Sequence, residues 1–415
     1  MSAAVSKRST CRLCESERLR LVLSLAPTPP ANAFVGAAER GSAQEVFPLD
    51  LYFCEDCTHV QLLDVVDPSV LFEHYVYVSG TSPAFVRHFK SYAAYVAAVA
   101  GPLDNALVVD IGSNDGTLLR AFRDDQNARI LGIDPARNLA EAATAAGIET
   151  LAEFFTPAVA RRIVGERGTA AVVTANNVFA HIDDLGGVVD GVDALLAPDG
   201  VFVFEVSYLL DVVEQVLFDT IYHEHLAYHS VRALIPFLAR HGLEVIEAQR
   251  VATHGGSLRV IAQRAGAKRS RGTSVDALLA LEEAAGLHLV ETFDRFARRI
   301  ADLGAELKDL LHGLKQDGKS IAGFGAPAKA TTLMYQFALD AGVIDYIIDD
   351  NPLKQGTFTP GMHIPVVSSD VLKTSAPDYL LILAWNFADP IIEKNRAFQD
   401  GGGQFIVPVP KLRVV

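Results

Sequence analysis

The feature that most restricts how this chain can fold is its set of four cysteines, which form two Cys-x-x-Cys pairs. Cys11 and Cys14 make the first pair, and Cys54 and Cys57 the second. Two such turns can place four thiolates at the corners of a tetrahedron, as in structural zinc sites. The alternatives are two disulfides, which a reducing cytosol disfavours, or a redox pair, which leaves the second turn unexplained. We therefore expect these four residues to bind a structural zinc ion, with His59 as a neighbour rather than a fifth ligand.

Size and charge restrict the class of protein further. With 415 residues the chain exceeds what one core normally serves, so we expect two or three domains. A net charge of −14 argues against a nucleic-acid partner, because phosphates require a basic surface. No apolar run reaches the roughly 18 residues that span a bilayer, and the N-terminal segment lacks the hydrophobic stretch of a secretory signal. We expect a cytoplasmic monomer without membrane or nucleic-acid partners.

The segment "NALVVDIGSNDGTLLRAF" predicts a buried strand, a glycine turn and a helix that begins at Gly116 or Thr117. A second strand, "ARILGIDPA", ends in Asp134, whose carboxylate can accept hydrogen bonds from a ribose. Asp110 and Asp115 add carboxylates to the expected loop. They would repel the diphosphate of a dinucleotide and suit a cationic ligand such as S-adenosylmethionine. An α/β domain whose acidic loop binds nothing is the alternative.

Residues after the next two strands extend this candidate donor site. In "ETLAEFF", Glu153 and Phe154 follow a third expected strand and offer an acid and a ring to an adenosine. The fourth strand, "AAVVTANN", runs into Asn176 and Asn177. The residues expected to bind the donor are Asp110, Gly112, Asn114, Asp115, Gly116, Asp134, Glu153, Phe154, Asn176 and Asn177.

A second strand–turn–helix pattern, "KSIAGFGAPAKATTLM", carries a G-x-G-x-x-A turn, and the next strand ends at Asp349. This pattern favours the alternative function, an NAD(P)-dependent sugar-nucleotide oxidoreductase. Pro327 in the turn and Lys329 in the helix are unusual for a dinucleotide, however, and suit a shorter phosphate-bearing ligand at the helix N-terminus. A dinucleotide, another phosphate ligand and a purely structural turn all remain open from the residues alone.

The segment "TIYHEHLAYHS", residues 220–230, concentrates three histidines, two tyrosines and a glutamate. Its H-x-H spacing differs from the H-E-x-x-H of helical zinc sites. The four cysteines already account for a metal, so we expect a proton-transfer site here rather than a second metal site.

Taken in order, these motifs resemble the three-domain sugar C-methyltransferases of antibiotic deoxysugar biosynthesis. The resemblance covers nearly the whole chain and includes "THVQL", "YVYVSGTS", "VVDIGSNDGTLL", "NNVFAHI", "FEVSYLLD", "YHEHLAYHS", "THGGSLRV", "GFGAPAKATTL", "IDDNPLKQGTFTPGMHIPV" and "LILAWNFADPI". It implies an α/β protein with an N-terminal zinc-binding domain, a central Rossmann-like class I methyltransferase domain and a second, C-terminal Rossmann-like domain. We expect these at residues 1–78, 79–245 and 246–415. The last would help to hold the sugar nucleotide, through Gly325, Lys329 and Asn386.

The resemblance also implies the reaction, methylation at C-3 of a dTDP-linked 4-keto-2,3,6-trideoxyhexose, in some cases a 3-amino sugar. A ketone at C-4 acidifies the C-3 proton because the carbanion delocalises onto the carbonyl oxygen as an enolate. Such an enzyme needs a base near C-3, hydrogen-bond donors near the C-4 oxygen and a methyl group held in line with C-3.

By the same resemblance His225 is the expected base, since the ordinary pKa of a histidine side chain lies near working pH. Tyr222 would donate to the enolate oxygen, and Glu224 would orient a histidine or contact the substrate. His181 would contribute to acid–base chemistry. The full catalytic set also includes one of Tyr75 and Tyr77, with His223 and His229 expected to be scaffold.

Overall fold

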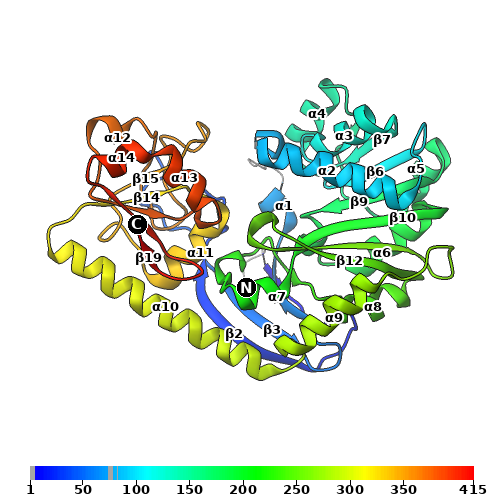
Figure 1. The fold of residues 1–415 in the computed structure, drawn as a ribbon, viewed down its shortest axis with the longest axis horizontal. Helices are drawn as coiled ribbons and strands as arrows, with labels where there is room; N and C mark the ends of the chain where they lie inside the picture. The colour runs from blue at the N-terminus through cyan, green and yellow to red at the C-terminus, as the bar shows by residue number, and fades with distance from the viewer. Residues whose placement is uncertain (1–4, 73–77, 82) are drawn as a thin grey trace.

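Figure 1 shows the computed structural model of the chain, which describes residues 5–72, 78–81 and 83–415. Two α/β units stand side by side, and the N-terminal strands lie beneath both. Within the described residues, no helix combines the length and the apolar composition needed to cross a membrane.

The N-terminal domain is built on a four-stranded antiparallel sheet in the order β11-β4-β3-β2. Its strands are β2 (Leu19–Thr28), β3 (Phe47–Cys54), β4 (Val60–Leu62) and β11 (Ala227–Tyr228). Every second residue of β3 is buried, as expected for a strand with one face on a core. The edge strand β11 comes from the middle of the chain, inside the histidine-rich segment, and pairs with Val60 and Gln61. The strands β1 (Val5–Lys7) and β5 (Asp64–Val66) pair with each other in a separate two-stranded antiparallel sheet.

The central domain is a seven-stranded sheet in the order β12-β13-β10-β9-β6-β7-β8, in which β13 alone runs antiparallel to its neighbours. Its strands are β6 (Leu107–Ile111), β7 (Arg129–Ile133), β8 (Thr150–Leu151), β9 (Ala170–Asn176), β10 (Leu196–Ser207), β12 (Leu243–Val251) and β13 (Ser257–Arg264). The helices are α2 (Pro83–Ala100), α3 (Thr117–Gln126), α4 (Arg137–Ala145), α5 (Pro157–Arg167) and α6 (Leu185–Leu195). This confirms the Rossmann-like methyltransferase fold.

The strand order of the central sheet reverses between β6 and β9, and ligands of such sheets bind outside the strand ends at that point. The boundary expected after residue 245 falls inside β12. Because β12 and β13 pair within the central sheet, residues up to Arg264 belong to that sheet.

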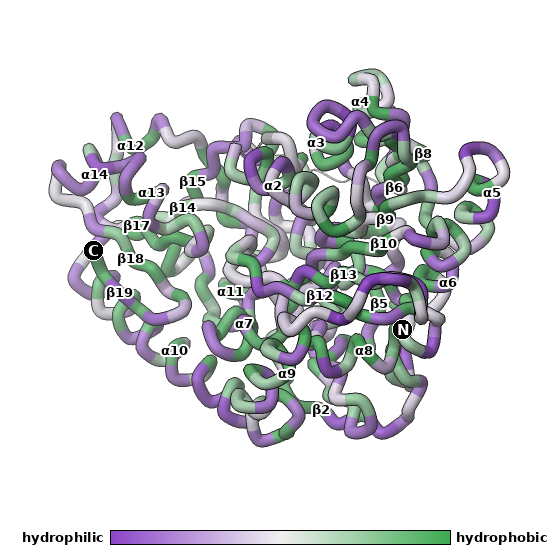
Figure 2. Tube along the Cα trace, turned by 45° about the vertical axis from the view of Figure 1, so that its right-hand side comes forward, coloured by the Kyte–Doolittle hydropathy of each residue, from purple (hydrophilic) through white to green (hydrophobic). Residues whose placement is uncertain are grey.

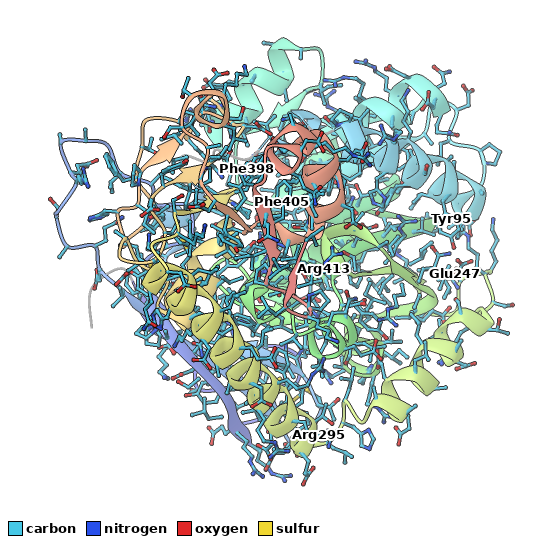
Figure 3. All side chains as sticks on the ribbon, turned by 60° about the vertical axis from the view of Figure 1, so that its left-hand side comes forward. Tyr95, Glu247, Arg295, Phe398, Phe405 and Arg413 are labelled. Carbon is cyan, nitrogen blue, oxygen red and sulfur yellow. The ribbon has the colours of Figure 1, made fainter. Side chains whose placement is uncertain are left out.

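The C-terminal domain repeats the design with a six-stranded sheet in the order β16-β15-β14-β17-β18-β19. The strands are β14 (Ile321–Phe324), β15 (Ile347–Ile348), β16 (Val366–Val367), β17 (Tyr379–Ile382), β18 (Gln404–Val407) and β19 (Arg413–Val414), the last antiparallel. The helix α11 (Ala328–Phe337) follows β14. Phe398 of α14 (Arg396–Asp400) packs on Phe405 of β18, with ring centres 5.2 Å apart (Figure 3). This confirms the second Rossmann-like unit.

Two helices connect the α/β units. Helix α9 (Thr273–Ala285) ends at Gly286, whose φ of 69° is the left-handed conformation of a helix C-terminus. Helix α10 (Val290–Gln316) then spans about 40 Å and runs along β2 (Figures 1 and 2). Its buried side chains recur every three or four residues: Phe293, Phe296, Ile300, Leu303, Leu307 and Leu311. This apolar stripe fixes the C-terminal domain against the N-terminal sheet.

Candidate active site

The four cysteine sulfur atoms come together as predicted. All four thiols are free, and the sulfur atoms lie within 4.8 Å of one another. Sγ of Cys11 is 3.5 Å from Sγ of Cys57, and Sγ of Cys14 is 3.5 Å from Sγ of Cys54. Zinc–sulfur bonds of about 2.3 Å require sulfur atoms about 3.8 Å apart in a tetrahedron. The set therefore fits a zinc ion, and four thiolates leave that ion no open position for catalysis.

The two cysteine turns share one local conformation. Glu15 and Thr58, which directly follow the second cysteine of each pair, have φ of 60° and 64°. The backbone N–H of Glu15 donates to the carbonyl oxygen of Cys11, and that of Thr58 to the carbonyl oxygen of Cys54 (2.9 and 2.8 Å). Both pairs are thus pre-shaped to direct two sulfur atoms toward one ion. His59 is buried and its ring lies 5.5 Å from that of His229.

The glycine turn after β6 takes the expected shape at the reversal point of the central sheet. Gly112, Asn114 and Gly116 have φ of 70°, 52° and 73°. The N–H of Asn114 donates to Oδ2 of Asp134 (2.8 Å), and the N–H of Ala136 donates to Oδ1 (2.9 Å). Burial raises the pKa of Asp134. This carboxylate braces the turn at the point where an acid was expected to meet a ribose.

Asp110 differs from the expectation that it lies in the loop. It is the fourth residue of β6, only 3% exposed, and accepts a hydrogen bond from Oγ1 of Thr174 (2.6 Å). Burial raises the pKa of Asp110 to about 7. The correction follows from strand length, because β6 continues through Ile111 before the first glycine. Asp115 is the carboxylate that lies within the loop.

Asp115 and Asn114 hold the segment that precedes α2. The N–H of Gly80 donates to Oδ2 of Asp115 (3.0 Å), and the N–H of Ser79 donates to Oδ1 of Asn114 (3.0 Å). Oδ1 of Asp115 also accepts from the Thr117 hydroxyl at the start of α3 (2.7 Å). The acidic loop and its neighbours are thus already ordered by backbone contacts.

The remaining expected donor residues lie at the same edge of the sheet. Glu153 pairs with Arg162, and Phe154 is 52% exposed. Asn176 is the last residue of β9. Asn177 has φ of 54°, and its N–H donates to a carbonyl oxygen of β10 (2.7 Å). All four lie at or just after the ends of β8 and β9, where the fold directs ligands.

His225 lies in a cluster of rings contributed by two segments. Its ring centre is 4.1 Å from that of Tyr222 and 5.0 Å from that of His181. Nδ1 of His225 is 2.7 Å from the carbonyl oxygen of Thr220. A carbonyl only accepts, so Nδ1 carries the proton and the lone pair of the neutral imidazole lies on Nε2. Burial, and then the neighbouring His225, hold the pKa of His181 well below its usual value.

Glu224 joins the N-terminal domain to this cluster. Its carboxylate is buried, and Oε1 accepts a hydrogen bond from Nδ2 of Asn32 (2.8 Å). His223 is buried beside Phe47, to whose carbonyl oxygen its Nε2 donates (3.2 Å), and burial lowers the pKa of His223 to about 4. Sequence reasoning did not identify Asn32, which lies far from the histidines along the chain. Of the remaining residues, His229 stacks on Phe179, while Tyr75 and Tyr77 lie outside the described residues.

Lys329 faces the same segment from the C-terminal domain. Its Nζ donates to Oδ1 of Asn386 (2.6 Å) and lies 3.5 Å from the ring centre of Trp385. Nε1 of Trp385 donates to the buried carboxylate of Asp219, close to the start of the histidine-rich segment (2.5 Å). Burial lowers the pKa of Lys329 to about 8. The structure therefore brings Lys329 and Asn386 together, as expected of one substrate site.

A second lysine, not identified from the sequence, lies beside the C-terminal glycine turn. Nζ of Lys354 donates to the carbonyl oxygen of Ala326 (2.7 Å), and burial lowers the pKa of Lys354 while Asp349 and Glu224 oppose that shift. Gly325 has φ of 85°, which an L-residue rarely adopts. Lys354 lies six residues after the end of β15, and no local pattern in the sequence marks it as a binding residue.

Comparison with known proteins assigns each part of the chain. Residues 11–72 match a zinc binding domain family, residues 85–248 a methyltransferase domain family, and residues 252–410 the C-methyltransferase C-terminal domain family. The C-methyltransferase NovU of Streptomyces niveus is 38% identical over 405 residues, which are 98% of this chain and 96% of NovU.

Two solved structures resemble the chain over a smaller part. Magnesium protoporphyrin IX methyltransferase of Synechocystis with bound S-adenosylhomocysteine is 15% identical, with coverage of 43% and 83% and a TM-score of 0.34. The 1,6-didemethyltoxoflavin-N1-methyltransferase of Burkholderia thailandensis is 18% identical, with coverage of 50% and 96% and a TM-score of 0.33.

The fold, the family matches and the cysteine cluster define an S-adenosylmethionine-dependent methyltransferase with a structural zinc domain. The chain belongs to the family of three-domain sugar C-methyltransferases, which confirms the resemblance of its motifs.

Proposed function

We propose that the enzyme methylates C-3 of a dTDP-linked 4-keto-2,3,6-trideoxyhexose, with or without an amino group at C-3. The observation that carries the proposal is the hydrogen bond from Nδ1 of His225 to the carbonyl oxygen of Thr220, which places the lone pair of the neutral ring on Nε2. S-adenosylmethionine supplies a methyl group on a positively charged sulfur. Carbon methylation requires a base of this kind, because a ring C–H is not a nucleophile.

In the proposed mechanism Nε2 of His225 removes the proton from C-3. The electron pair of the broken C–H bond delocalises onto the C-4 oxygen, where Tyr222 donates a hydrogen bond to the enolate. C-3 then forms its new bond to the methyl carbon, and the electron pair of the methyl–sulfur bond remains on sulfur. Burial keeps His181 neutral, so this ring adds no second positive charge beside the imidazolium that forms on His225. The imidazolium finally releases its proton to water.

The nucleotide half of the substrate would bind at the C-terminal turn. Lys329 and Lys354 place two ammonium groups around the N-terminus of α11, where backbone N–H groups also favour an anion. Glu224 directly precedes His225 in the chain, and its charge opposes the lowering of the Lys354 pKa by burial. A diphosphate held here would put the sugar next to the histidines.

A panel of dTDP-4-keto sugars with methyl-labelled S-adenosylmethionine tests the function. We expect label on carbon, and exchange of the C-3 proton in deuterated water where deprotonation occurs without methyl transfer. Label on oxygen or nitrogen, or no transfer to any member of the panel, would contradict the proposal. Binding of NADH to the C-terminal turn would instead support the oxidoreductase alternative.

A further inference from the structure

The zinc-binding turn reaches the catalytic segment through one side chain. Arg12 lies between the two cysteines of the first pair and is only 4% exposed. Its Nε donates to Oδ1 of Asp183 (3.0 Å), and its NH1 donates to Oε1 of Gln61 (3.1 Å). NH1 also points at the carbonyl oxygens of Leu62 and Leu226, the latter at 3.4 Å. One guanidinium therefore joins the zinc turn, β4 and two segments of the central domain.

The partners of Arg12 adjoin both histidines of the ring cluster. Leu226 directly follows His225, and Asp183 lies two residues after His181. The N–H of Leu226 donates to the carbonyl oxygen of Ala180 (2.9 Å), so the two segments also touch directly. The N–H of Leu62 shares the Leu226 carbonyl with Arg12 (2.9 Å). The relative position of the two imidazoles thus depends on contacts that converge on Arg12.

We propose that Arg12 is a positioning residue that sets His225 against His181, and that the zinc ion acts in catalysis by fixing the turn that carries Arg12. The proposal rests on the function proposed above. The guanidinium suits this task because its planar fork of five donors can bind a carboxylate, an amide and two carbonyls simultaneously. A shift of about 1 Å at a reacting centre can cost about 10²-fold in rate. A zinc ion without an open coordination position would therefore still influence turnover.

Arg8 provides a matched control. Its NH1 also binds Oδ1 of Asp183 (3.2 Å) and the Asp183 carbonyl oxygen (3.3 Å). Its Nε donates to the carbonyl oxygen of Thr10 (3.1 Å) rather than to Leu62 or Leu226, and its side chain is 25% exposed. Comparing Arg12→Met with Arg8→Met therefore separates loss of the Asp183 contact from loss of the contacts to the catalytic segment.

The first experiment measures methyl transfer, zinc content and S-adenosylmethionine affinity for both variants. We expect Arg12→Met to lower kcat about 10- to 100-fold, with zinc content and the KM of the donor unchanged, and Arg8→Met to stay within about twofold. Arg12→Lys, which keeps the charge but lacks the fork, should fall between them, and it replaces Arg12→Met if that variant does not fold. Equal kcat in the Arg8 and Arg12 variants would overturn the proposal. So would a loss of zinc or donor binding in step with kcat.

The second experiment needs no substrate. Hydrogen–deuterium exchange is followed by mass spectrometry in peptides that cover residues 178–183 and 222–228. We expect both peptides to exchange faster in Arg12→Met than in wild type or Arg8→Met, while peptides of α3 do not change. Unchanged exchange in both peptides would overturn the role of Arg12 even if turnover fell. If the wild type methylates no sugar nucleotide, the proposed function fails while this experiment still decides whether Arg12 holds the two segments.

Discussion

The two glycine turns of this enzyme share a backbone design. Each follows the strand beside a reversal in its sheet, and each contains a glycine in the left-handed conformation. In each an aspartate after the neighbouring strand accepts a hydrogen bond from a backbone N–H of the turn. Asp134 accepts from Asn114 at 2.8 Å, and Asp349 accepts from Ala326 at 2.6 Å.

The side chains around the two turns carry opposite charge. Asp115 lies in the central turn, whereas Lys329 and Lys354 surround the C-terminal one. Asp349 spends both oxygens on backbone N–H groups, as Asp134 does, so neither of these aspartates accounts for the difference. The comparison teaches that a glycine turn defines where a ligand approaches, while the neighbouring charges define which ligand. An acidic turn suits a sulfonium and a basic turn suits a diphosphate.

The largest expected effect is at His225, where the two ligands would meet. His225→Asn should lower kcat by about 10² to 10⁴, the usual contribution of a general base. Binding of S-adenosylmethionine, measured by calorimetry, should not change, because the residue belongs to neither turn. Near-normal turnover in this variant would show that another group removes the proton.

The basic turn can be tested by removing one ammonium group. Lys354→Met should raise the KM for the sugar nucleotide about 10- to 100-fold, since a hydrogen bond to a charged group contributes about 1.5 to 3 kcal/mol. The control is Lys394→Met, which removes an exposed lysine that pairs with Asp350. Equal KM values in the two variants would remove Lys354 from the substrate site.

A change at the acidic turn should affect the binding of S-adenosylmethionine rather than that of the sugar nucleotide. Asp134→Asn should weaken S-adenosylmethionine binding about 10-fold, because it removes the charged acceptor at the expected ribose position. The KM for the sugar nucleotide should not change. Asp124→Asn removes an exposed carboxylate that pairs with Arg123 and serves as the control. If Asp134→Asn weakened both ligands equally, the division of labour between the turns would be wrong.

The smallest effect is a pH dependence at the basic turn. Burial disfavours the charged form of Lys329 and lowers its pKa to about 8, so the ammonium group loses its proton as pH rises through that value. The KM for the sugar nucleotide should therefore increase several-fold between pH 7 and pH 9. Lys329→Met should have a high KM without this increase. An unchanged pH profile in that variant would assign the titration to another group.

Local patterns predicted the elements of this fold well, and non-local contacts decided the rest. The cysteine turns and both strand–turn–helix units follow from spacing and apolar periodicity within short windows. The sequence pattern did not show that β6 continues through Ile111. Asp110 was therefore expected in the loop, but it lies in the sheet. Arg12, Asn32 and Lys354 carry no local signal, because only the packing of three domains brings them to the histidines.

The two-residue strand β11 has a consequence for how the enzyme is made. Its partner β4 leaves the ribosome long before it, so the N-terminal sheet waits with an open edge while most of the central domain is synthesised. Domain exchange between relatives meets the same constraint. A zinc domain moved into a relative must be transferred together with the histidine-rich segment that completes its sheet. Otherwise β4 would pair with a β11 strand that evolved beside a different zinc domain.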